Sequence, residues 1–139
     1  MILHTTAELI NLHTIRHFVE DNALRLTADE DTSYDLAHAV DECATNIIEH
    51  GYQGRPGTIE IEIDRLGEDM LIVLRDHAPP FDPTSVPPPD LTLPLEQREP
   101  GGLGIYLTRR MVDDCRYRPL PDGNELTLIK HVNAIPPQS

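Results

Sequence analysis

Apolar residues recur at helical spacing in two stretches near the start of the chain. The first covers residues 5–22, where a Thr-x-x-Glu capping box precedes apolar positions three and four residues apart. The second covers residues 33–50, with Thr32 and Ser33 as its expected cap and residues 24–31 as a connector. Both patterns predict amphipathic helices that end at about Asn22 and at Gly51. The apolar side of the second comprises Leu36, Val40, Cys43, Ala44, Ile47 and Ile48.

After residue 58 the apolar period changes from 3.6 to 2, which is typical of strands. Isoleucines at 59, 61 and 63 alternate with acidic residues, and residues 66–69 supply a turn before a second apolar run at 70–74, its expected antiparallel partner. Residues 1–4, 116–120 and 125–132 predict further strands, the last two joined by a turn at 121–124. The order of elements predicts a single α+β domain over residues 1–139, with helices on one face of a mixed or antiparallel sheet.

Between these elements lies a proline-rich stretch, residues 79–100, which has no periodic apolar pattern and predicts a long surface loop. A third helix should open on the glycines at 101–104 and extend to about Cys115, with Leu103, Leu107 and Met111 stacked on one side. Residues 133–139 predict a frayed tail.

Composition narrows the choice of partners. The formal net charge of −13 disfavours duplex nucleic acid and anionic membranes, although one nucleotide remains acceptable if a cation and backbone N–H groups offset its charge. There is no apolar run of bilayer length and no secretion signal, so we expect no membrane association and a cytoplasmic location. Cys43 and Cys115 fall in predicted helices and read as reduced, mostly buried thiols.

Three segments carry residues suited to chemistry, and each has a simpler interpretation. Glu42 and Asn46 lie one helical turn apart and suit a base beside a metal ligand, or they form a solvated helix face. Asp76 ends an apolar strand and suits an acceptor for an exocyclic amine, or a turn. The glycines at 101–104 expose unpaired N–H groups to an anion, or simply end the loop. His13 and His17 lie one turn apart, but no third metal ligand is suggested nearby.

These three segments occur in the order found in one superfamily. Residues 41–52 look like its N-box, residues 76–83 like its first glycine box and residues 101–107 like its second. The chain therefore resembles the GHKL (gyrase, histidine kinase and MutL) ATPases over almost its whole length. Within them it is most similar to the anti-sigma regulatory factors, small serine kinases that act on anti-anti-sigma proteins. The resemblance implies a Bergerat-type two-layer ATP-binding sandwich.

The resemblance also assigns roles by position. It implies ATP and Mg²⁺ as cofactors, with Glu42 as the catalytic base, Asn46 as the Mg²⁺ ligand and residues 82–100 as the ATP lid. Arg98 in that lid is a candidate phosphate contact, and His77 flanks the implied site. One departure matters: Ala78 stands where the family usually has glycine, which puts ATP affinity in question. The implied nucleotide-binding residues are Asn46, His50, Asp76, Ala78, Gly101, Gly102, Leu103, Gly104 and Ile105.

Three functions are compatible with these residues. The first is an ATP-dependent serine/threonine kinase that phosphorylates a STAS-type anti-anti-sigma protein and thereby holds or frees a sigma factor by partner switching. The second is an ATP-gated binding module without turnover, favoured by Ala78 and by the many prolines of the loop. The third is an interaction domain that no longer binds nucleotide. The resemblance further suggests a homodimer, and the sequence does not identify the sigma factor, the antagonist or the signal.

Overall fold

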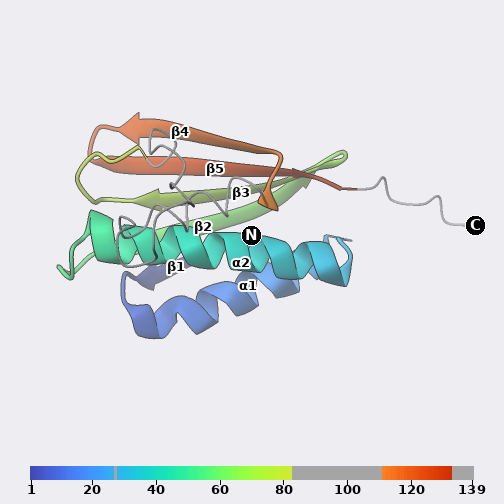
Figure 1. Ribbon diagram of the computed structural model, residues 1–139, viewed down its shortest axis with the longest axis horizontal. Coiled ribbons are helices and arrows are strands. Elements are labelled where there is room, and N and C mark those ends of the chain that lie inside the picture. The colour runs from blue at the N-terminus through green and yellow to red at the C-terminus, as the bar shows by residue number, and fades with distance from the viewer. Residues whose placement is uncertain (27, 83–110, 133–139) are drawn as a thin grey trace, which may run out of the picture.

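The computed structural model describes residues 1–26, 28–82 and 111–132. Within these ranges two α-helices and five strands form the α+β domain that the sequence predicts (Figure 1). The elements are β1 (Ile2–Thr6), a 3₁₀ turn η1 (Leu9–Asn11), α1 (Leu12–Arg25), α2 (Glu30–Asn46), a π-helical turn η2 (Ile47–Gly51), β2 (Thr58–Leu66), β3 (Asp69–Asp76), β4 (Asp114–Leu120) and β5 (Gly123–His131).

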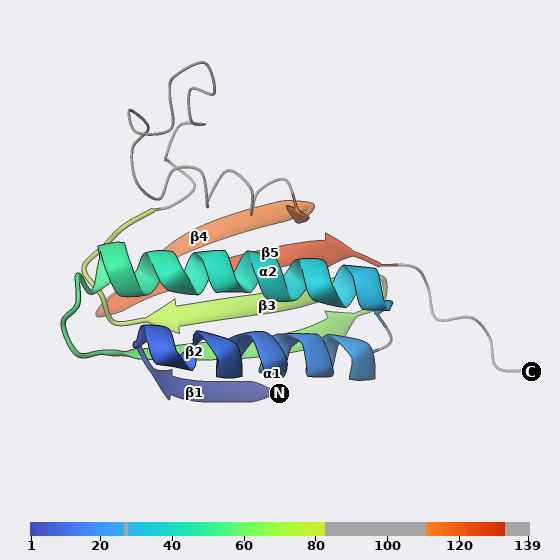
Figure 2. The ribbon, with the colours of Figure 1, turned by 60° about the horizontal axis from the view of Figure 1, so that its bottom comes forward.

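The strands form one sheet in the order β1-β2-β3-β5-β4, and every neighbouring pair is antiparallel. The predicted pairing of the strands around residues 59–63 and 70–74 is confirmed, with Ile61 opposite Leu74. Both helices lie across one face of this sheet, as the turned view in Figure 2 shows. The two-layer sandwich is therefore confirmed, and the described strands are antiparallel rather than mixed.

The core lies between the helices and the sheet because the apolar residues of both layers face inward. The alternation along β2 and β3 turns every second side chain toward the helices. In α1 and α2, side chains three or four residues apart are buried against the sheet. Each such aliphatic side chain contributes about 1.5–3 kcal/mol through burial. The largest fully buried side chains are Ile15, Val19, Leu36, Val40, Ile59, Ile61, Ile63, Met70, Ile72, Leu74 and Leu128.

The predicted start of the first helix is wrong. Thr5 and Thr6 belong to β1 and pair with Ile59 and Thr58 of β2, so they cannot cap a helix. The side-chain amide of Asn11 instead donates to the carbonyl and hydroxyl oxygens of Thr6. Strand pairing here overrides a local capping signal, and α1 begins at Leu12 and continues to Arg25.

The second helix, in contrast, begins earlier than predicted, at Glu30. Its N-cap is Asp29, whose carboxylate accepts a hydrogen bond of 2.6 Å from the N–H of Thr32, and Glu30 and Asp31 add negative charge to the first turn. The helical run ends at Gly51 as predicted. However, its last turn, η2, has π geometry, which is frequent near functional sites.

Cys115 lies in β4, so its predicted helical placement is wrong, and the structure has turned to strand by Asp114. Cys43 is buried in α2, and neither cysteine forms a disulfide. The proposed lid beyond Asp82, most of the third helix and the C-terminal tail lie outside the described residues. In the part of the chain that is described, no helix is long and apolar enough to cross a bilayer.

Candidate functional site

Residues from α2, η2 and three strands meet around a small cavity of about 30 Å³, which is room for about two water molecules. It contains three of the predicted site residues, Asn46 from the end of α2 and Asp76 and Ala78 from the end of β3 and the segment after it, about 30 residues later. Its full lining is Cys43, Asn46, Ile47, Gly51, Asp76, Ala78, Phe81, Tyr117, Asn124 and Leu126.

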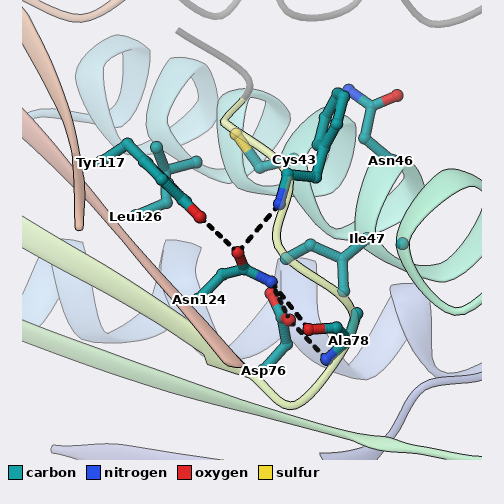
Figure 3. A pocket seen from close by; sticks show the side chains of 10 residues that line it. Cys43, Asn46, Ile47, Asp76, Ala78, Tyr117, Asn124 and Leu126 are labelled. Carbon is teal, nitrogen blue, oxygen red and sulfur yellow. Dashed lines mark hydrogen bonds between the residues drawn. The ribbon is translucent and has the colours of Figure 1, made fainter. Parts of the chain in front are cut away.

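Asp76 is the last residue of β3 and continues the inward-facing alternation of that strand, so its carboxylate is buried with 5% exposure. Its Oδ1 accepts hydrogen bonds of 2.9 Å from the N–H of Ala78 and from Nδ2 of Asn124 (Figure 3). Burial raises the pKa of Asp76, and these two hydrogen bonds oppose that effect. Asp76 is thus both a turn residue and a buried acceptor in the cavity, so its two sequence interpretations are compatible.

Asn124 was not identified from the sequence, where it was part of the turn at residues 121–124. It lies directly opposite Asp76 in the β3–β5 pairing, which places both side chains on the helix-covered face of the sheet. The residue before it, Gly123, makes this approach possible. A Cβ on Gly123 would lie 1.8 Å from the carbonyl oxygen of Asp76, so only glycine fits. The strand register, which the turn motif alone does not specify, decides this contact.

Ala78 does not strain the backbone, because within the described residues the only non-glycine residue with positive φ is Gln53. Its methyl group faces Gly51, where an added Cβ would approach the Ala78 Cβ to 3.1 Å. The missing side chain at Gly51 therefore accommodates the extra methyl at Ala78. Gly51, which in the sequence looked like a helix stop alone, is also a lining residue of the cavity.

Asn46 is at the end of α2, is 8% exposed and lines the cavity. Figure 3 shows its side chain on the opposite side of the view from Asp76. Its buried Nδ2 has no hydrogen-bond partner among the described residues. A buried polar group of this kind is costly unless a ligand satisfies it, so Asn46 fits a contact to a polar ligand.

Glu42 lies one helical turn before Asn46 and is half-buried, with its carboxylate 3.9 Å from Nε2 of His38. It does not line the cavity itself. Glu42 and Asn46 therefore differ in exposure: the amide belongs to the cavity, and the carboxylate lies nearer the solvent.

Tyr52 fixes the position of the segment that follows Asp76. Its ring is buried, and its hydroxyl donates to the carbonyl of Thr58 (2.7 Å) and accepts from the N–H of His77 (2.8 Å). The ring packs where a side chain on Gly57 would stand, 2.1 Å from its nearest atom. The end of η2 is thereby joined to the start of β2 and to the segment that follows β3.

The remaining predicted residues do not join this cavity within the described structure. His50 is exposed and is not a lining residue, while His77 borders a neighbouring hollow beside Arg55 and Pro80. The rings of His13 and His17 stack at 6.3 Å, and the described ranges contain no group of three or more residues suited to a metal ion. Gly101, Gly102, Leu103, Gly104 and Ile105 lie outside the described residues.

Comparison with known families identifies the family of the chain. A family model described as the histidine kinase-like ATPase domain matches residues 5–130. This range includes Glu42, Asn46, Asp76 and Asn124.

Individual proteins resemble the chain over different lengths. It is 28% identical over 116 residues to the serine/threonine-protein kinase BtrW of Bordetella bronchiseptica, covering 83% of this chain and 82% of that protein. It is 32% identical over 86 residues to the serine-protein kinase RsbW of Bacillus cereus, covering 59% of this chain and 54%, about half, of that protein.

Solved structures share the fold as well. The RsbU and RsbW domains of Rv1364c from Mycobacterium tuberculosis align with a TM-score of 0.60 at 18% identity, covering 94% of this chain and 32% of that one.

Proposed function

Because the chain belongs to the histidine kinase-like ATPase domain family, we propose that it binds ATP and phosphorylates a serine or threonine of a STAS-type anti-anti-sigma protein. The observation that carries the proposal is that one buried cavity joins a carboxylate acceptor, Asp76, with an unsatisfied amide, Asn46. Relatives named as serine kinases cover most of the chain in one case and more than half of it in another.

The cavity offers a role for each part of the nucleotide. The Asp76 carboxylate suits the exocyclic N6 amine of adenine, which is a hydrogen-bond donor. The Asn46 amide, on another side of the cavity, suits the polyphosphate end. Its carbonyl oxygen is also a ligand type that Mg²⁺ accepts, and Mg²⁺ supplies neutralisation of phosphate charge when bound. We assign residues 101–105 of the second glycine box to the phosphates on the basis of their sequence.

In the proposed reaction, the oxygen of the partner's hydroxyl forms a bond to the γ-phosphorus of ATP as the bond to the β,γ-bridging oxygen breaks, so that ADP leaves. Glu42 accepts the proton of the hydroxyl. Its half-buried position, 3.9 Å from Nε2 of His38, leaves it accessible to a group that a partner inserts from solvent. Phosphoryl transfer depends mainly on such positioning and on charge neutralisation.

The small volume of the cavity favours a second candidate, an ATP-gated binding module. A cavity of about 30 Å³ is smaller than a purine, so the base must widen it on entry. That movement would change the neighbouring surface, including Phe81, which is 43% exposed. In this candidate the altered surface captures a partner without turnover.

The deciding experiment mixes the protein with radiolabelled Mg-ATP and purified STAS proteins. The kinase proposal predicts label on a serine or threonine of one STAS protein, with the transfer rate lowered at least about 100-fold in Glu42→Gln. ATP binding and STAS capture without ADP formation would favour the binding module. Failure to bind ATP at all would contradict both. Sedimentation of the protein with and without a sigma factor tests the proposed homodimer and the partner switch.

A further inference from the structure

The side chain of Asn124 is bonded on every side. Its Nδ2 donates to Oδ1 of Asp76 at 2.9 Å and to the carbonyl oxygens of Ala78 and Pro79 at 3.2 Å each. An amide nitrogen carries only two hydrogens, so these three acceptors use its donor capacity completely.

The amide oxygen is equally occupied. Oδ1 of Asn124 accepts from the hydroxyl of Tyr117 at 2.6 Å and from the backbone N–H of Phe81 at 3.1 Å. A backbone N–H can only donate, so the amide oxygen must face Phe81 and the amide nitrogen must face Asp76. Asn124 is 6% exposed and has no hydrogen-bonding capacity left for a ligand. It acts on a ligand only through Asp76.

The consequence for Asp76 is that its two oxygens differ. Oδ1 receives two donors, from Ala78 and Asn124, whereas Oδ2 receives none from the described residues. Oδ2 is therefore the acceptor left for a ligand in the cavity. Without Asn124, the carboxylate would keep one donor and gain freedom to rotate.

We propose that Asn124, oriented by Tyr117, is the positioning residue that makes this pocket select adenine over 6-oxopurines. This inference rests on the proposed ATP binding. Adenine presents an N–H donor at position 6, whereas guanine and hypoxanthine present an oxygen acceptor there, which a fixed carboxylate oxygen repels. A site built for one hydrogen-bonding partner rejects the analogue that lacks it.

Protonation of Asp76 gives a second readout. Burial raises the pKa of Asp76, and the Asn124 hydrogen bond and the charge of neighbouring His77 oppose this. The Tyr117 hydroxyl, which donates to the Asn124 amide oxygen, is a further titratable group nearby, and burial raises its pKa. Loss of the Asn124 amide removes a donor to the ionised carboxylate, so the acid limit of ATP binding should move to higher pH.

The test measures dissociation constants of ATP, GTP and ITP for the full chain by calorimetry between about pH 5 and 8. Asn124→Leu, which keeps the side-chain size, should weaken ATP at least about tenfold and GTP and ITP by less, so that the ATP preference narrows. Tyr117→Phe keeps the ring and leaves the Phe81 N–H to donate to Asn124, so it should give a smaller change in the same direction. Its milder perturbation also serves if Asn124→Leu does not fold.

The matched control is Asn22→Leu, which removes another buried asparagine, bonded to the Phe18 carbonyl in α1 and remote from the cavity. It should lower the melting temperature and leave the ATP:GTP ratio and the pH limit unchanged. Suppose that the wild type prefers ATP, and that Asn124→Leu and Tyr117→Phe keep its ratio of ATP to GTP dissociation constants within twofold and lose ATP binding at the same pH. The positioning role is then refuted and ATP binding stands. If the wild type binds none of the three nucleotides, both proposals are overturned.

Discussion

Replacing Gly123 by alanine tests how closely β3 and β5 must approach at the site. The new Cβ would stand 1.8 Å from the carbonyl oxygen of Asp76 and 3.0 Å from the Cα of His77, and both are backbone atoms. Gly123 does not have a positive φ, so the penalty comes from this collision and not from backbone conformation.

The size of the effect follows from the sheet register. Ordinary contact requires the methyl and the oxygen to separate by roughly another 1.5 Å, which is large against a strand spacing of about 4.8 Å. We expect the β3–β5 ladder to open at Arg75 opposite Glu125 and at Asp76 opposite Asn124. Losing about two ladder hydrogen bonds and the Asp76–Asn124 bond, at about 1 kcal/mol each, lowers the free energy of unfolding by about 3 kcal/mol.

For a domain of 139 residues, with an unfolding entropy of about 2.1 cal/mol/K per residue, this corresponds to a fall in melting temperature of about 10 °C. Calorimetric melting of Gly123→Ala and of the wild type measures it, and ATP titration should show a parallel loss of affinity.

Gly54→Ala is the matched control, because Gly54 has a φ of +79° and no atom within 4 Å of an added Cβ. It should cost about 1 kcal/mol from conformation alone and leave ATP affinity unchanged. A Gly123→Ala protein that melts within about 2 °C of the wild type with unaltered ATP affinity would show that the strands do not need this approach.

Three further predictions concern single groups. Asp76→Asn should keep both Oδ1 hydrogen bonds yet replace the free acceptor by a donor, so ATP affinity falls at least about 100-fold. Since burial raises the folded pKa of Asp76, the wild type should lose stability relative to this variant as pH rises through about 4. A difference in melting temperature between the two proteins that is the same at pH 3 and pH 7 would contradict this. Tyr52→Phe removes a buried hydroxyl that bonds to the Thr58 carbonyl and should lower the free energy of unfolding in urea by about 1–3 kcal/mol, whereas an unchanged midpoint would mean the hydroxyl is not needed. The hydrogen bond to Asp69 raises the pKa of His131, so the stabilisation from this pair is complete below about pH 6.5 and is lost as pH rises through the folded pKa. His131→Gln should therefore remove the fall in melting temperature over this pH range. An identical fall in both proteins would exclude the pair as its source.

Local patterns predict well where the periodicity is long and uniform. The alternating isoleucines of β2 and the apolar side of α2 specify which residues are buried. A period of 2 or 3.6 places all the apolar side chains on one face of the strand or helix, and only that face can be buried. The same patterns failed at element ends. Thr5 and Thr6 match a helix cap, but strand pairing with β2 satisfies their backbone hydrogen-bonding groups and is adopted instead of the cap.

The site divides in the same way. Glu42, Asn46, Asp76 and Ala78 were identified as candidates from motif order in the sequence, and the fold brings the last three to one cavity. Asn124 and the cavity role of Gly51 were not, because each is defined by a contact with a residue distant in the chain.

By itself, the amino-acid sequence determined the α+β class, the inward faces of the elements and the residue types that could bind a nucleotide. Tertiary structure alone decided that β5 enters beside the end of β3, with Gly123 against the Asp76 carbonyl and Asn124 against its carboxylate. The physical reason is that hydrophobic periodicity specifies which face of a strand is buried, whereas the partner across the sheet depends on register and on steric fit between backbones 48 residues apart in the chain.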